Sequence, residues 1–435
     1  MSKTFRTVRG MRDYLKEDKW KLNYVNNIVR ELYYKYNYDE VSTPIVEFFD
    51  LVAAKAGAEI REKMYVFEDK GGRLLALRPE MTAPIARLYI ENLMRSSPKP
   101  VRLGYIGTCY RYDNPQRGRY REFWQAGFEL FGSDYPESDI EILNIAYDLM
   151  LKLGFTDFKI RIGHIGVLRS FFNIIKISEE LQDSILGSLD KKEFDKIDEI
   201  MKENNIPENI MELFYGILKL RGDDYTNIIS QLKSLLSGYP EVLKEVEKFT
   251  ILIQLLSKLD IIKKIEVDMS LARGLEYYTG LIFEIFVEGL EIAVGGGGRY
   301  DKLVELFGGE RTPAVGFAAG IDRLIIAMED KGLFRKSSER KILITPLTPE
   351  QIPACFIAAR KVRELGYKTE VDVLRRNIKR ALSYAVSNNY SFIIFIGEKE
   401  ERENKVTVKK LDSGEQHTIN IDDISKILMP VVSLY

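Results

Sequence analysis

The chain has 435 residues, with 64 Lys and Arg against 65 Asp and Glu, a formal net charge of -1 and a hydrophobic fraction of 45%. This is the composition of a soluble multidomain protein, and the balanced charge argues against a protein that coats nucleic acid by charge alone. The two histidines and two cysteines exclude a disulfide framework and argue against a zinc site, so any catalysis must rely on Arg, Glu, Asp, Tyr and backbone groups.

The first half of the chain predicts a mixed α+β domain. The N-terminus has no apolar run of signal-peptide length, and no uncharged stretch approaches the roughly 20 residues of a membrane span, so we expect a cytoplasmic protein without membrane contact. Apolar residues recur at helical spacing over 18–36, and residues 39–44 form a short strand that Pro44 ends. Further strands are predicted at 63–67, 73–77, 102–106 and 123–131, with a helix at 138–153.

The middle of the chain predicts a helical insertion. Between about residues 164 and 259, Leu and Ile recur at helical spacing among Lys, Glu and Asp, so we assign an insertion domain to 165–262. Strands are predicted again at 266–271 and 279–287, and we expect them to complete the interrupted sheet. The first domain then spans 1–330, and the polar stretch 331–340 is expected to be a linker.

The C-terminal part predicts a separate α/β domain over 341–435. Strands at 341–345, 369–373, 391–396 and 405–408 are accompanied by helices at 351–365 and 377–388 and a closing helix after 422. Such alternation predicts a small α/β domain with a mostly parallel sheet.

The segment richest in polar residues is 109–131. It consists of two strand-like halves joined by a loop that contains Pro115 and Gly118. Period-two alternation puts Phe123, Gln125 and Glu129 on one face, where Gly127 leaves open space, and an opposed strand can add Arg111 to that face. An exposed hairpin with ordinary cross-strand charge pairs is the alternative.

Two shorter segments also carry polar residues in unusual settings. Glu80 and Thr82 stand two apart, so an extended backbone would project both to one side, where the carboxylate can accept from an ammonium group. Helix capping by either residue is the favoured alternative. Arg273 stands beside Tyr277 and Tyr278, and its guanidinium fork suits a phosphate, although a surface turn with a tyrosine in the core explains the segment equally well.

The region 293–323 contains a run of glycines and an arginine in an unusual position. Four successive glycines, 295–298, indicate close approach by a ligand or another backbone, with generic glycine turns as the alternative. Arg323 begins a helix, where a cation competes with the positive end of the helix dipole unless an anion lies nearby. Neither a phosphate loop of the G-x-x-x-x-G-K-[ST] type nor a G-x-G-x-x-G fingerprint occurs in the sequence.

Taken together, these segments resemble the histidyl-tRNA synthetase family of class II aminoacyl-tRNA synthetases. Arg273-Gly-Leu-Glu-Tyr-Tyr278 is similar to the family's histidine signature, and residues 111–129 are similar to class II motif 2. The segment up to Pro44 resembles the dimer-forming motif 1, and residues 316–323 resemble motif 3. The resemblance implies an α+β fold, in which an antiparallel-sheet catalytic domain with a helical insertion is followed by an α/β anticodon-binding domain.

The resemblance also implies roles for individual residues. Glu80, Thr82 and Gln125 would hold the ammonium and carboxylate ends of histidine, and Glu129 and Tyr278 would receive its imidazole nitrogens, with Tyr277 in the same pocket. Arg111 and Arg273 would bracket the α-phosphate of ATP as the catalytic residues. Phe123 would stack on adenine, Arg323 would meet the γ-phosphate, and Asp113 and Arg119 would complete the ATP site. ATP is expected as a substrate with Mg²⁺, and no metal ligand is assigned to a protein side chain.

Two positions depart from the family pattern. Asp113-Asn114 stands where bacterial members commonly have Glu then Arg, so bacterial readout of the tRNA acceptor end is not carried over. Glu276 stands where Asp is commoner, a difference of one methylene.

The function implied is activation of histidine with ATP to histidyl-adenylate and transfer of histidine to the 3′ end of tRNA(His), by a homodimer whose motif 1 helix buries its apolar face between subunits. The rival is a regulatory subunit of ATP phosphoribosyltransferase, and a weaker third reading is a tRNA-binding module without chemistry. Regulatory subunits of that type generally lack the C-terminal domain and lose catalytic residues, whereas this chain has the domain and retains Glu80, Arg111 and Arg273.

A basic cluster in the C-terminal domain is the expected anticodon contact. It comprises Arg375, Arg376, Asn377, Lys379 and Arg380, and helical spacing would put Arg376 and Arg380 on one side. The cations can neutralise phosphates, and Asn377 can read an unpaired base edge. A solvated basic face is the alternative when the cluster is considered in isolation.

Overall fold

The computed structural model describes residues 5–54, 56–273, 275–290, 292–334 and 340–429. The chain divides into two compact units, residues 1–334 and 335–435. Most of the polar run 336–340, expected as part of the linker, lies outside the described residues. Across the described ranges, no helix combines the length and the apolar character needed to cross a membrane.

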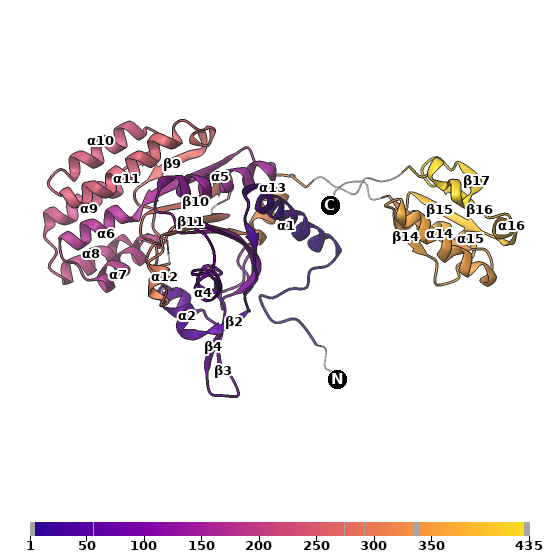
Figure 1. The fold of residues 1–435 in the computed structure, drawn as a ribbon, viewed down its shortest axis with the longest axis horizontal. Coiled ribbons are helices and arrows are strands. Elements are labelled where there is room, and N and C mark those ends of the chain that lie inside the picture. Colours follow the sequence, from indigo (N-terminus) through magenta and orange to yellow (C-terminus); the bar gives the residue numbers. More distant parts are fainter. Residues whose placement is uncertain (1–4, 55, 274, 291, 335–339, 430–435) are drawn as a thin grey trace. The chain divides into compact units, whose positions relative to one another are not determined.

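A nine-stranded sheet forms the centre of the first unit (Figure 1). The five pairings from β5 through β6, β12, β11 and β10 to β7 are all antiparallel, while β1 pairs with β5 and β7 pairs with β9 in parallel. The predicted α+β class with a largely antiparallel sheet is therefore confirmed. In spatial order the strands are β1 (Asp39–Glu40), β5 (Val101–Tyr110), β6 (Glu122–Phe131), β12 (Ala314–Gly320), β11 (Gly295–Arg299), β10 (Leu281–Val287), β7 (Phe158–His164), β9 (Ile265–Asp268) and β8 (Arg221–Gly222).

Helix α1 (Lys16–Tyr36) packs against α5 (Pro136–Lys152) and α13 (Ile321–Asp330). Its apolar residues Leu22, Val25, Val29 and Leu32 are completely buried within the single chain. The expectation that this face is reserved for a second subunit is therefore wrong, because the fold of one chain already covers it.

A small three-stranded sheet and three helices lie before the motif 2 hairpin. The sheet has the order β2 (Val46–Phe48), β4 (Leu74–Leu77) and β3 (Val66–Glu68). The helices are α2 (Phe49–Ala53), α3 (Ala58–Glu62) and α4 (Thr82–Asn92). A fourth short helix, α12 (Leu303–Leu306), follows β11 and contacts α4.

Six helices are inserted in the chain between β7 and β9, two strands that pair side by side in the sheet. Figure 1 shows them gathered next to the β7–β9 end of the sheet. They are α6 (Ile165–Ile174), α7 (Glu179–Asp190), α8 (Phe194–Glu203), α9 (Glu208–Leu218), α10 (Tyr225–Leu235) and α11 (Pro240–Leu256), and the 3-10 helix η1 (Asp260–Lys264) leads back into β9.

The second unit has a five-stranded sheet in the order β14-β13-β15-β16-β17. The prediction of a mostly parallel sheet is wrong for half of it, because β15–β16 and β16–β17 are antiparallel. The strand β17 was missed because its residues are mostly exposed and carry no apolar alternation. The expected closing helix is only the 3-10 helix η3 (Ile421–Lys426). The other elements are β13 (Lys341–Pro346), η2 (Pro349–Gln351), α14 (Ile352–Glu364), β14 (Lys368–Val371), α15 (Ile378–Ser387), β15 (Phe392–Ile396), α16 (Glu398–Arg402), β16 (Lys405–Lys410) and β17 (Gln416–Asn420).

Candidate active site

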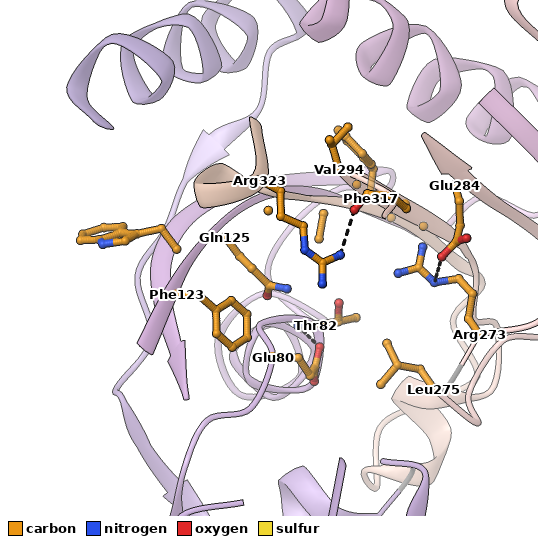
Figure 2. A pocket seen from close by; sticks show the side chains of 18 of the residues that line it. Glu80, Thr82, Phe123, Gln125, Arg273, Leu275, Glu284, Val294, Phe317 and Arg323 are labelled. Atoms are coloured by element: carbon orange, nitrogen blue, oxygen red, sulfur yellow. Dashed lines mark hydrogen bonds and ion pairs between the residues drawn. The ribbon is translucent and has the colours of Figure 1, made fainter. Parts of the chain in front are cut away.

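One pocket on the nine-stranded sheet, with a cavity volume of about 170 Å³, brings together every site residue predicted for the first unit. Its walls come from β6, β11 and β12, the start of α4, the loop after β9 and the start of α13. Figure 2 shows Arg273 and Arg323 directing their guanidinium groups into the space above Glu80 and Thr82. The predicted residues that line it are Glu80, Thr82, Arg111, Asp113, Arg119, Phe123, Gln125, Glu129, Arg273, Tyr277, Tyr278 and Arg323.

Positive charge is concentrated at Arg323, in the first turn of α13. Its Nε and Nη1 donate to the carbonyl oxygens of Gly118 at 3.2 Å and Ala293 at 2.8 Å. Burial lowers the pKa of Arg323, and the positive charges of Arg119 and Arg111 lower it further. The Glu284 carboxylate offsets part of this repulsion, and an anionic ligand beside Arg323 would offset more, so this part of the pocket suits negative charge.

Arg111 and Arg273 are anchored to backbone carbonyls and keep donors for a ligand. The Nε of Arg111 donates to the carbonyl of Pro79 at 2.8 Å, and Nη1 of Arg273 donates to that of Phe283 at 3.1 Å. A β-carbon on Gly296 would collide with the Arg273 guanidinium. Close approach by other groups therefore explains the glycine run. The glycines form strand β11 of the sheet, and the groups that approach them are the Arg273 side chain and the neighbouring strands.

Glu129 is the most deeply buried acid of the pocket, with 1% of its surface exposed. It accepts hydrogen bonds from Thr82 Oγ1 at 2.9 Å, from the Tyr105 hydroxyl at 3.2 Å and from the Tyr300 hydroxyl. Burial is the main cause that raises the pKa of Glu129 to about 8, because charge is costly away from water. A β-carbon on Gly316 would collide with this carboxylate, so glycine there gives it room.

Two buried tyrosines of the signature segment stand beside Glu129. The ring centroids of Tyr277 and Tyr278 are 4.8 Å apart, and the ring of Tyr277 is 5.6 Å from that of Tyr300. Burial raises the pKa of Tyr278, so its hydroxyl keeps its proton and can donate or accept. The surface-turn alternative placed a tyrosine in the core, which agrees with this burial, but it does not explain why Arg273 and both tyrosines line one pocket.

Glu80 caps helix α4 and lines the pocket at the same time. Its carboxylate accepts the backbone N–H groups of Thr82 at 2.6 Å and Ala83 at 2.8 Å, which confirms the favoured capping alternative. The extended backbone expected for this pair is wrong, because Thr82 is the first residue of α4. A carboxylate has about four acceptor positions, so Glu80 retains capacity for a ligand ammonium group.

The hairpin of β5 and β6 supplies the remaining predicted residues. The guanidinium carbon of Arg111 lies 5.4 Å from the ring centroid of Phe123, and Cys109 Sγ donates to Gln125 Oε1 at 3.2 Å. The Asp113 carboxylate is 2.7 Å from Nζ of Lys63, and Arg119 closes a tight turn through backbone bonds to Gln116. The exposed-hairpin alternative is excluded, since β6 pairs with β12 in the middle of the sheet.

Some features of the pocket were not predicted. The open space expected beside Gly127 does not exist, because the ring of Tyr105 on the opposite strand fills it. Tyr105 and Tyr300 hold Glu129, and Glu284, whose carboxylate is 4.0 Å from Arg273 Nε, also lines the pocket. The position of Tyr300, two residues after the glycine run, was the available signal.

The basic cluster of the second unit differs from its prediction. Helix α15 begins at Ile378, so Arg375 and Arg376 precede it and share no helical face with Arg380. Arg376 forms a salt bridge with the buried Asp372 and lies over the ring of Tyr384 at 3.9 Å, which makes it a structural residue. The Asn377 side chain accepts the Arg380 N–H at 2.9 Å, so its oxygen is used as the helix cap. Arg375, Lys379 and Arg380 are exposed.

Comparison with known proteins follows the same division of the chain. A family model described as histidyl-tRNA synthetase matches residues 10–324, and one described as anticodon binding domain matches residues 341–429. Among curated proteins, histidine–tRNA ligase of Methanocaldococcus jannaschii is 40% identical over 97% of this chain and 99% of its own length, and that of Saccharolobus islandicus is 38% identical over 97% of each.

Solved structures agree in fold. The apo histidyl-tRNA synthetase of S. aureus is 28% identical, with a TM-score of 0.68 over 98% of this chain and 100% of the other. A Bacillus halodurans structure, titled as an ATP phosphoribosyltransferase regulatory subunit/histidyl-tRNA synthetase, is 26% identical, with a TM-score of 0.77 over 91% and 99%. On the extent of these matches, the chain belongs to the histidyl-tRNA synthetase family.

Proposed function

We propose that the protein activates histidine with ATP to form histidyl-adenylate and then transfers the histidyl group to the 3′ end of tRNA(His). The observation that carries the proposal is a single pocket that combines four arginines with a buried carboxylate and two buried phenols. The arginines suit phosphate oxygens, and the carboxylate and phenols suit a small polar ring with two nitrogens.

In this proposal Glu129 and Tyr278 bind the imidazole of histidine. Glu129 accepts from one ring nitrogen, and Tyr278 pairs with the other, because a neutral imidazole has one donor and one acceptor. The cap carboxylate of Glu80 accepts from the ammonium group, with Thr82 beside it, and the amide of Gln125 binds the carboxylate end. Tyr277 contributes to the wall of this pocket.

Arg111 and Arg273 act on the reacting phosphate. When the histidine carboxylate attacks the α-phosphorus, its oxygen forms a new bond and pyrophosphate leaves, so negative charge grows on the phosphate oxygens. Fixed guanidinium groups stabilise this charge without having to reorganise. Arg323 and Arg119 bind the outgoing phosphates, and Phe123 offers its ring to adenine. Asp113, held by Lys63, fixes the loop that carries Arg119.

Magnesium is expected together with ATP. Mg²⁺ usually binds through one or two carboxylates and the substrate phosphates, and the pocket-lining carboxylate of Glu284 next to Arg273 fits that donor set. Bound there, the ion would neutralise phosphate charge.

The most direct test of this function is charging of tRNA(His) with labelled histidine. We expect histidyl-tRNA to accumulate in the presence of ATP and Mg²⁺, and no charging of tRNA for other amino acids. The rival, a regulatory subunit of ATP phosphoribosyltransferase, would bind histidine without charging tRNA. Retention of Glu80, Arg111 and Arg273 in one pocket favours the enzyme.

For tRNA, we propose that residues 341–435 bind the anticodon, using the exposed cations Arg375, Lys379 and Arg380. Exposed apolar side chains flank them, with Val373 77% and Leu374 70% exposed, and such groups can pack against unstacked bases.

We further propose the division into a catalytic domain, 1–330, interrupted by the insertion 165–262, and a linker, 331–340. Because tRNA is charged where translation occurs, the proposal places the enzyme in the cytoplasm.

A homodimer is also proposed, on grounds other than the buried face of α1. Several apolar side chains in and next to the small sheet of β2, β4 and β3 are exposed, and exposed apolar surface of this kind can be covered by a protein partner. A second copy is the occupant that the family's dimer-forming motif suggests. Sedimentation at micromolar concentration tests this, and a Phe48→Asp variant should shift the protein toward monomer. The exposed side chains are Ile45, Val46, Phe48, Val66, Phe67 and Leu74.

A further inference from the structure

Arg169, on helix α6 of the insertion, binds the backbone of the signature segment directly. Its Nε donates to the carbonyl oxygen of Tyr278 at 3.2 Å, and its Nη2 lies 3.3 Å from that of Glu276. These carbonyls belong to the peptides before Tyr277 and after Tyr278. One guanidinium group therefore holds both ends of the two-residue stretch that carries the pocket tyrosines.

The guanidinium is itself held in place by a second helix of the insertion. Nη2 of Arg169 donates to Oδ1 of Asp183, on α7, at 2.8 Å. The two side chains are 20% and 14% exposed, so this ion pair is largely shielded from water. A hydrogen bond between charged groups at this distance is among the stronger kinds, and it fixes the plane of the fork.

The opposite side of the segment has a backbone contact and a long ion pair. Leu275 forms an isolated β-bridge with Ala56, and Nη2 of Arg61 is 3.9 Å from Oε2 of Glu276. The Arg61–Glu276 pair is longer than a hydrogen bond, whereas both contacts of Arg169 with the carbonyls of Glu276 and Tyr278 are within hydrogen-bond range. The direction of a side chain follows from its backbone, so these contacts set where the rings of Tyr277 and Tyr278 point.

We propose that Arg169, oriented by Asp183, is a positioning residue that sets the affinity for histidine and couples the helical insertion to the amino-acid pocket. It touches no substrate and acts through Tyr278. The inference rests on the proposed function, in which Tyr278 binds the imidazole. A purely structural Arg169 would instead change stability, or all kinetic parameters, without singling out histidine.

The test is histidine-dependent ATP–pyrophosphate exchange with Arg169→Lys, which keeps the charge but loses the fork, and with Asp183→Asn. We expect the KM for histidine to rise about tenfold in Arg169→Lys and several-fold in Asp183→Asn, with kcat and the KM for ATP within about twofold of the parent protein. The matched control is Lys233→Ala, which removes an exposed ion pair with Glu247 elsewhere in the insertion and should change nothing. Asp183→Asn keeps the test valid if Arg169→Lys folds poorly in urea titration.

A double-mutant cycle with Tyr278→Phe checks that the effect passes through Tyr278. The effect of Arg169→Lys on the KM for histidine should shrink in the Tyr278→Phe background, since the hydroxyl being positioned is gone. Additive effects, or an unchanged KM for histidine in both single variants, would overturn the inference and leave the proposed function intact. Absence of histidine-dependent exchange in the parent protein would overturn both, so the two failures are distinguishable.

Discussion

Thr82 Oγ1 donates a hydrogen bond to Oε1 of Glu129 across 2.9 Å, joining the first residue of α4 to the C-terminal part of β6. The two residues are 47 positions apart in the sequence. This bond connects the group proposed for the ammonium end of histidine to the acceptor proposed for its ring. A change at Glu129 is therefore expected to affect both ends of the amino acid.

The stability of the protein should depend on pH through Glu129. Its pKa is raised from an ordinary value of 4.5 to about 8, so between these values the folded chain holds a proton that the unfolded chain releases. Stability from this group is therefore lost as pH rises toward and through about 8. Relative to Glu129→Gln, the parent protein should lose roughly 2 to 4 kcal/mol of unfolding free energy between about pH 5 and 9. Urea titrations giving the same pH slope for both proteins would contradict this.

Gly316→Ala should damage histidine binding selectively. The added β-carbon would collide with the Glu129 carboxylate and push it from the three hydroxyl donors that hold it. We expect the KM for histidine in pyrophosphate exchange to rise at least about tenfold, with a smaller change for ATP. Gly187→Ala on α7 is the matched control, because a β-carbon there meets nothing within 4 Å. Equal effects of the two substitutions would rule out this role for Gly316.

Arg273→Ala should slow adenylate formation far more than it weakens histidine binding. The charge that Arg273 meets grows mainly in the transition state, so its loss lowers kcat and leaves the binding of histidine largely intact. Single-turnover kinetics separate the two effects. A raised histidine requirement with an unchanged rate at saturation is the result that this role does not allow.

The sequence predicted the catalytic sheet and the composition of the pocket better than the contacts inside it. Period-two alternation was sufficient for Gln125 and Glu129, because local backbone geometry decides which face a strand residue occupies. Tyr105 reaches Glu129 from the paired strand β5, 24 residues away in the sequence, and Tyr300, directly after β11, is 171 residues away. Neither contact leaves a signal in the alternation pattern of β6 itself. Gly127 shows the same limit, since the ring that fills its space belongs to the neighbouring strand.

In the second unit, one of the errors concerned a helix boundary. Arg376 was placed on a helical face, but the buried Asp372 accepts its backbone N–H and pairs with its guanidinium, which ends the loop two residues before α15. The spacing of cations alone cannot reveal that one of them has a buried partner. The strand at 405–408 was predicted, as β16 (Lys405–Lys410), but its antiparallel pairing was not, and the edge strand β17 was missed because an edge strand needs no apolar alternation.

The cations of this unit should therefore separate into two groups. Arg376→Ala leaves the fully buried Asp372 side chain without its ion partner and should cost on the order of 3 kcal/mol of stability. The exposed pair Lys379 and Arg380, changed together to Ala, should leave unfolding unchanged, raise the tRNA requirement for charging and reduce its salt dependence. Urea titration and aminoacylation at two salt concentrations measure both effects. Unaffected charging by the double variant would remove this surface from tRNA binding.

In our proposal, the pocket around Glu129 and Arg273 activates histidine. Exchange of labelled pyrophosphate into ATP, measured with each of the twenty amino acids in turn, tests it most directly because it requires neither tRNA nor the second unit. The account predicts exchange with histidine alone, and its loss in Arg273→Ala. Exchange supported by another amino acid, or none with histidine in the parent protein, would contradict it.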